Sequence, residues 1–219
     1  KIGHTRVAAH ASARRGFVLA EHLQRAKEAQ EDLLWVSPLN QRIERDVILY
    51  KDYLISAGVV LARADDASAA KALLQDAIAL TGKPGQETIQ DLSVLNNLGN
   101  LMHAEHRYDE ALEYRERVLT ISERLFGGLQ AERISFESNR ASALLERGQP
   151  REALSILQGL QNASGNTTLW ATYGIPSEIA NAESRLGDFA SAWRRLVDVQ
   201  NTDPELLSVE VLGNLTYYA

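Results

Sequence analysis

Apolar residues recur along this chain at spacings of three and four, which place side chains on one face of an α-helix. The clearest stripe consists of Ile43, Val47, Tyr50, Leu54, Ala57 and Leu61. Ala64-Asp65-Asp66 interrupts the stripe, and a second helical stretch follows over residues 67–80, before a turn-rich segment at 82–85. Signals for β-strands, such as strict alternation of apolar and polar residues, are almost absent. The sequence therefore predicts an all-α protein.

The same helix–break–helix pattern recurs at a nearly fixed period. A pair of small residues twelve positions apart marks each copy: Gly58 with Ala70, Gly99 with Ala111, Ala141 with Ala153, and Ala180 with Ala192. Successive copies begin 41, 42 and 39 residues apart (58 to 99, 99 to 141, 141 to 180), and Gly213 marks a fifth. Self-similarity at this period predicts a stack of helical hairpins. Small residues suit the crossing of two antiparallel helices, because large side chains there would keep the backbones apart.

The repeats define the expected domain organisation. We expect an N-terminal helical cap over residues 1–45, then four repeats within 46–219, at about 48–85, 88–128, 130–165 and 174–203. Residues 205–219 are expected to form the first helix of a fifth repeat, which Pro204 opens. Some cap is expected because an open end of a helical stack exposes apolar surface. The chain begins without methionine and ends soon after a hairpin opens, so we expect a piece of a longer protein.

Composition narrows the classes of function. Hydrophobic residues make up 45% of the chain, which is enough for a core. The net charge is −6 with both signs mixed, which argues against a nucleic-acid-binding surface. Apolar runs are far shorter than a bilayer span and no signal peptide is visible, so we expect a soluble fragment without direct membrane insertion, cytoplasmic or periplasmic. The absence of cysteine excludes disulfides and thiolate metal sites and leaves the compartment undetermined.

The second and fourth copies resemble the tetratricopeptide repeat. The residues of the second copy that carry the resemblance are Leu95, Leu98-Gly99, Met102, Tyr108 and Ala111-Leu112. Those of the fourth are Phe189, Ala192, Leu196, Val199 and Pro204. Periods of 39–42 in place of about 34 are similar to the long-loop subtype typified by kinesin light chain. The resemblance implies a right-handed α–α superhelix of antiparallel helix hairpins, in which the first helix of each hairpin lines a concave groove.

The resemblance also implies a function. A chain of this kind is expected to be a non-catalytic interaction scaffold that binds a peptide or partner protein in its groove. Similar repeats often form regulatory parts of bacterial multidomain signalling proteins, so a sensory or autoregulatory domain, for example of a serine/threonine kinase, is an alternative. Homo-oligomerisation through the last helix and the N-terminal region is a further alternative. The sequence contains no phosphate loop and no nucleophile elbow, and we expect neither enzymatic activity nor a cofactor.

Asparagine recurs at equivalent positions of the first helices. Aligned by their small residues, the copies place Asn97 over Asn139, and Asn100 over Asn181 and Asn214. Asparagine is a poor residue for a helix interior because its amide competes for backbone hydrogen bonds, so its repeated use needs a reason. The resemblance implies that these amides clamp the backbone of an extended peptide, to which an amide offers a donor and an acceptor. The alternative is that they bond neighbouring helices and only set the pitch of the stack.

Two arginines and a histidine complete the candidate site. Arg63 and Arg185 each lie five residues after the small residue of their first helix. Guanidinium groups there could hold a ligand carboxylate by paired hydrogen bonds, or each could be a solvated charge beside the helix dipole. His103 faces the groove in this register. His103 and His106 are the nearest approach to a metal-binding pair, but no third strong ligand is suitably spaced, so we expect no metal site.

Two further features are left for the tertiary structure to decide. In the third copy Glu137 and Arg140 stand where large apolar residues are expected, so the register of this copy is open. Trp193 directly follows Ala192 in a second helix and is expected to be a packing residue. Trp35 and Trp170 lie in or next to irregular segments, where either could anchor a partner.

Overall fold

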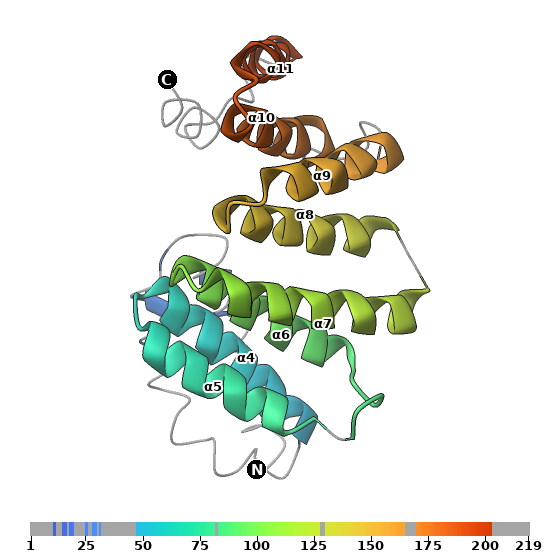
Figure 1. Ribbon diagram of the computed structural model, residues 1–219. Coiled ribbons are helices and arrows are strands. Elements are labelled where there is room, and N and C mark those ends of the chain that lie inside the picture. Colours follow the sequence, from blue (N-terminus) through green and yellow to red (C-terminus); the bar gives the residue numbers. More distant parts are fainter. Residues whose placement is uncertain are drawn as a thin grey trace. The chain divides into compact units, whose positions relative to one another are not determined.

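Figure 1 presents the computed structural model of the chain. The structure describes residues 47–202 apart from 82, 128–129 and 165–169, together with isolated positions between 11 and 31. Every regular element within these residues is a helix, which confirms the all-α fold. A search of the same residues for a helix of bilayer-spanning length and hydropathy finds none. Most of the expected cap at 1–45, Trp35, and the whole expected helix at 205–219 lie outside the described residues.

The helices between residues 47 and 202 pair as four hairpins, in which each first helix packs against the second helix that follows it. The pairs are α4 (Val47–Arg63) with α5 (Ala67–Ala79), α6 (Ile89–Ala104) with α7 (Tyr108–Phe126), α8 (Gln130–Glu146) with α9 (Pro150–Ser164), and α10 (Ile175–Arg185) with α11 (Phe189–Thr202). A π-helical segment, Trp170–Gly174, leads directly into α10. The chain divides into two compact units, Lys1–Gly127 and Gly128–Ala219, and each unit contains two of the hairpins.

The members of all four pairs of small residues are buried, and in the first two hairpins the glycine lies where the two helices meet. A Cβ added to Gly58 would lie 3.4 Å from the carbonyl oxygen of Ala70, and one added to Gly99 would lie 3.6 Å from that of Ala111. The backbones of paired helices thus approach within van der Waals distance of each other's first side-chain atom. This close approach is the physical reason for the twelve-residue pairs in the sequence.

The turn inside each hairpin has one recurring backbone geometry. One residue of every turn adopts the left-handed conformation, and these residues are Asp65 (φ 63°), His106 (φ 59°), Gly148 (φ 85°) and Gly187 (φ 86°). The following residue donates its N–H to a carbonyl five positions earlier, as Arg107 does to Met102 at 2.8 Å. This 6→1 bond is typical of a helix that ends through a left-handed residue. The sequence repeat is therefore also a repeat of backbone conformation.

In the first unit, α6 is the central packing element. Val94 and Leu98 of α6 are buried in one cluster with Leu54 of α4 and Leu74 of α5. A second cluster contains Leu101 and Met102 of α6, Ala70 of α5 and Ala111 of α7. Burying side chains of this size from water stabilises a fold by about 1.5–3 kcal/mol each. Because α6 takes part in both clusters, its remaining surface is held in a defined orientation.

In the second unit, α10 packs against α8, α9 and α11. Its residues Ile175 and Ile179 are completely buried. Glu137 and Arg140 of α8, which left the register of the third copy open, form an ion pair. Arg140 lies 3.5 Å from a carboxylate oxygen of Glu137 and 3.4 Å from one of Glu152 in α9. Half-buried charges at these positions are thus accommodated by ion pairs between and within helices.

A buried ion pair ties α4 to α6 in the first unit. It joins Lys51 of α4 to Asp91 of α6, whose side chains are 5% and 1% exposed. Thr81 hydrogen-bonds both groups, and Thr88 and Asp91 form a capping box at the start of α6, with the Thr88 N–H 2.8 Å from Asp91 Oδ2. Burial alone would raise the pKa of Asp91, but hydrogen bonds from Lys51, Thr81 and Thr88 outweigh it and hold the pKa below its usual value. The segment between α5 and α6 is thereby anchored near both of its ends, by Thr81 and by Thr88.

Candidate functional site

Two candidate asparagines lie on α6 in the first unit. Asn97 is half-buried, and its side-chain N–H donates to the carbonyl oxygen of Ser93 in the same helix, at 2.9 Å. Asn100 lies about one turn further along and is exposed. Within the part of the chain that the structure describes, the Asn100 amide makes no hydrogen bond. Asn97 thus keeps its amide oxygen, and Asn100 its whole amide, for a group outside the helix.

His103 and Arg63 accompany these asparagines in the first unit. The His103 ring packs edge-on against the ring of Tyr108, with centroids 5.5 Å apart. The hydroxyl of the same tyrosine lies 2.6 Å from Nδ1 of His106, whose ring centroid is 5.8 Å from that of Tyr108. Tyr108 thus packs against both histidines. Arg63 is the exposed last residue of α4. Among the described residues no group of three His, Asp or Glu side chains is arranged to hold a metal ion.

In the second unit, Arg185 makes contacts between two first helices. The Arg185 guanidinium of α10 donates to Asn181 Oδ1 at 2.9 Å, to the Leu145 carbonyl of α8 at 2.8 Å, and to the Glu146 carboxylate. The Leu145 carbonyl, in the last turn of α8, also accepts the Gly148 N–H at 3.0 Å. Arg185 therefore bonds the neighbouring first helix α8, and Asn181 accepts a hydrogen bond from Arg185 within its own helix. Asn181 retains its amide N–H groups as donors.

Two candidate asparagines remain, one at position 139 and one at position 214. Asn139 is half-buried in α8, and Asn214 lies outside the described residues. The first helices adjoin within each unit, because α4 contacts α6 and α8 contacts α10. The structure therefore groups Asn97, Asn100, His103 and Arg63 on adjoining helices of one unit, and Asn139, Asn181 and Arg185 on adjoining helices of the other.

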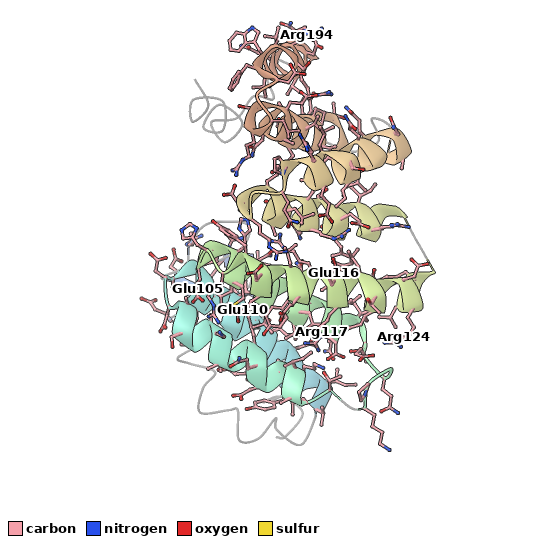
Figure 2. All side chains as sticks on the ribbon, viewed as in Figure 1. Glu105, Glu110, Glu116, Arg117, Arg124 and Arg194 are labelled. Carbon is pink, nitrogen blue, oxygen red and sulfur yellow. The ribbon has the colours of Figure 1, made fainter. Side chains whose placement is uncertain are left out.

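The surface contains one feature that sequence reasoning missed. Trp193, which was expected to pack, is 66% exposed, and Phe189 is 68% exposed on the same helix α11. The spacing of four between them was the available signal, because it places both rings on one side of the helix. Elsewhere the surface carries charges of both signs, and Figure 2 labels Glu110, Glu116, Arg117 and Arg124 along α7.

Paired helices with small residues at every crossing, joined by one recurring turn, define a helical-repeat protein. Residues 90–158 match the family model described as tetratricopeptide repeat. This segment includes all of α7 and α8 and most of α6, and its match confirms the resemblance found in the sequence. A comparison with curated proteins finds no match.

Several solved structures share this fold. Nearly identical TPR-like repeats of a kinesin light chain from Podosopora anserina share 20% identity, with 90% of this chain and 95% of that one covered, at a TM-score of 0.73. BtubC (BKLC) from P. vanneervenii shares 14% identity, with 92% and 90% covered, at a TM-score of 0.66. PilF from Pseudomonas aeruginosa shares 17%, with 91% and 78% covered, at 0.63.

At these identities the likeness establishes the fold and nothing beyond it. The chain has the tetratricopeptide-repeat fold, and kinesin-light-chain repeats are among its structural neighbours, as the repeat period predicts. Folds of this class generally mediate protein–protein interaction and are typically non-catalytic, which suggests protein partners.

Proposed function

We propose that this chain is a non-catalytic scaffold that binds an extended peptide segment of a partner protein along its first helices. The observation that carries the proposal is the exposed amide of Asn100 on α6, which makes no hydrogen bond within the described residues. The same repeat position holds Asn181 and Asn214. Asparagine recurring at one position of the repeat is poorly explained by helix stability, since asparagine lowers helix propensity.

The chemistry of the asparagines suits a peptide backbone. Each peptide unit presents one N–H donor and one C=O acceptor, and a side-chain amide can satisfy both whatever the peptide's side chains are. The bond from Asn97 to Ser93 holds one side-chain N–H and leaves the amide oxygen as an acceptor. A group already oriented before binding loses less conformational entropy on binding. Arg63, exposed at the end of α4, supplies a cation for an acidic peptide residue.

The proposal is tested with peptides selected from a random display library against the whole chain, with affinities then measured by calorimetry. Asn100→Ala and Asn97→Ala are each expected to weaken binding about fivefold, which corresponds to about 1 kcal/mol for one net hydrogen bond. Asn162→Ala is the matched control, because Asn162 is an exposed asparagine on the second helix α9. Circular dichroism and the melting temperature check that each variant folds.

Unchanged affinity in both α6 variants would contradict the proposed site, and so would an equal loss in the Asn162→Ala control. A loss confined to the α6 variants with unchanged melting temperature supports the site. This result would also exclude a purely structural role, because the loss of a structural hydrogen bond lowers the melting temperature.

A further inference from the structure

A hydrogen-bonded bridge joins the N-terminal ends of α4 and α6 in the first unit. The side-chain amide nitrogen of Gln90 in α6 donates to Asp52 Oδ1 at 2.5 Å and to the Ile48 carbonyl oxygen at 3.2 Å, both in α4. Both of these neighbours are acceptors, so the NH2 group of the amide must face them. The bridge therefore fixes the Gln90 side chain and leaves its amide oxygen, Oε1, as an acceptor.

Asp52 gives this bridge an uncompensated negative charge. Lys51 and Asp91, on the same two helices, neutralise each other in their buried pair, and Arg63 lies at the other end of α4. Asp52 is half-buried, and within the part of the chain that the structure describes its side chain interacts only with the uncharged Gln90 amide. Asp52 Oδ2 and Gln90 Oε1 thus offer two acceptors and one negative charge, with no donor between them.

Two exposed isoleucines accompany the bridge. Ile48 and Ile89 are 68% and 62% exposed. Each lies ten residues before the small residue of its helix, so they hold the same repeat position on two adjoining helices. Ile48 lies one helical turn before Asp52 on the same face of α4, and Ile89 directly precedes Gln90. The acceptors therefore have apolar surface beside them, which suits a ligand group with an aliphatic stem and a cationic head.

The position of Asp52 also distinguishes the first hairpin from the others. Six residues before the small residue, the other first helices have the uncharged Ser93, Ser135 and Gly174. A carboxylate in one copy alone favours one register of a bound peptide over the others. Gln90 and Asn97 lie seven residues apart on one face of α6, which is about 10 Å along the helix. About three residues of an extended peptide span this distance, so one peptide can contact both side chains.

From these contacts we infer that the Asp52–Gln90 bridge binds a basic residue, arginine or lysine, of the partner's peptide. The inference rests on the proposed peptide site and names the chemistry of one residue of its ligand. The cationic group donates to Asp52 Oδ2 and Gln90 Oε1, while its stem packs on Ile48 and Ile89. Arginine suits the site better than lysine, because its planar fork of five donors can reach acceptors on two different side chains.

The first test repeats the selection from the random display library on the native chain and on variants at position 52. Peptides selected on the native chain are expected to carry arginine or lysine at one position. Those selected on Asp52→Lys are expected to carry an acidic residue there, and those selected on Asp52→Asn to show neither preference. Replacing the basic residue by alanine is expected to weaken binding to the native chain about fivefold and to change binding to Asp52→Asn little.

The variants are matched to separate charge from fold. In Asp52→Asn the side-chain oxygen can still accept the Gln90 N–H, so the bridge and the melting temperature are expected to be retained. Asp76→Asn is the control, because Asp76 is an exposed aspartate on the second helix α5 of the same hairpin. It is expected to keep the preference of the native chain.

A second measurement does not depend on the library. N-acetyl-argininamide is titrated into the isotope-labelled full chain, and the side-chain amide resonance of Gln90 is followed by NMR. The resonance is expected to shift with this compound and not with N-acetyl-citrullinamide, which has the same length and no charge. The shift is expected to be lost in Asp52→Asn, to be kept in Asp76→Asn, and to decrease at high salt.

Selected peptides without a basic preference would overturn the inference, and so would equal Gln90 shifts with both compounds or an undiminished shift in Asp52→Asn. A Gln90 resonance that changes with protein concentration alone would overturn it too, because the occupant would then be a second copy. If Asn97→Ala and Asn100→Ala weaken binding while Asp52→Asn does not, this inference fails and the proposed function stands. If no peptide is selected, the proposed function fails, and the Gln90 shift by itself decides whether the bridge binds a cation.

Discussion

Asp91→Asn is expected to lower the free energy of unfolding by about 3–5 kcal/mol, because it leaves the ammonium group of Lys51 buried without a counter-charge. Lys51→Met is expected to have a comparable effect, since it strands the Asp91 carboxylate. Both side chains are almost fully buried, so water cannot replace the lost partner. The measurement is denaturant unfolding followed by circular dichroism. The matched control is Glu110→Gln, which removes one side of the exposed pair with Arg107 and is expected to change stability little.

The double variant Lys51→Met with Asp91→Leu distinguishes the loss of a partner from the loss of the pair. Replacing a buried pair by apolar residues is often neutral, so most of the stability is expected to return. A deficit of about 1 kcal/mol is expected to remain, because Leu cannot accept the Thr88 N–H in the capping box. A single variant as mild as Glu110→Gln would contradict the prediction.

The same pair gives stability a pH dependence of known sign. The folded-state pKa of Asp91 lies below its usual value, so its contribution is fully present above the unfolded-state pKa of about 3.9. It is lost as the pH falls through the folded-state pKa, because the carboxylate must then take up a proton. The difference in unfolding free energy between the native chain and Asp91→Asn is therefore expected to shrink below about pH 4. A difference that stays constant down to pH 2 would contradict this assignment.

Gly58→Ala is expected to destabilise the chain, whereas Gly99→Ala is expected to stabilise it. A Cβ at position 58 would lie 2.8 Å from Cγ of Leu74, which is fully buried and cannot move freely. A Cβ at position 99 would make ordinary contacts, the nearest at 3.5 Å. The expected loss at 58 is up to about 2 kcal/mol, since overpacking costs about 1–3 kcal/mol and the gain in helix propensity offsets about 1 kcal/mol of that cost.

The expected gain at position 99 is about 0.5–1 kcal/mol, which is the difference in helix propensity between Gly and Ala. Thermal unfolding of the two single variants measures both effects, and each variant is the control for the other, because both replace the small residue of a first helix. Changes of the same sign in the two variants would contradict the prediction. It would mean that the crossings of the first two hairpins have equal room for a methyl group.

The turns and helix ends could be predicted from local sequence. The break at Ala64-Asp65-Asp66 lies between the end of α4 at Arg63 and the start of α5 at Ala67, and Pro176 lies in the first turn of α10. Such signals act over three to six residues, through hydrogen bonds and backbone preferences that neighbouring residues share. They are therefore readable in one sequence without knowledge of the fold.

The partners of polar side chains could not be predicted in this way. Lys51 and Asp91 are forty residues apart, as are Leu145 and Arg185. The repeat period places such residues on adjoining first helices, but whether two given side chains meet depends on how the helices lie beside each other. The sequence left open whether Asn181 clamps a peptide or bonds a neighbouring helix, and nothing in it indicated that Lys51, in the second turn of α4, is buried.

By itself, the sequence determined that this chain is all helical, that its helices form repeated hairpins, and that small residues mark their crossings. These properties follow from the period of apolar residues and from steric limits on backbone approach, which are local and repeat with the chain. Only the tertiary structure decided which charges are buried together, which amide is left solvated on α6, and which aromatic rings remain uncovered on α11. Burial is a property of what packs against a residue, and that partner comes from another part of the chain.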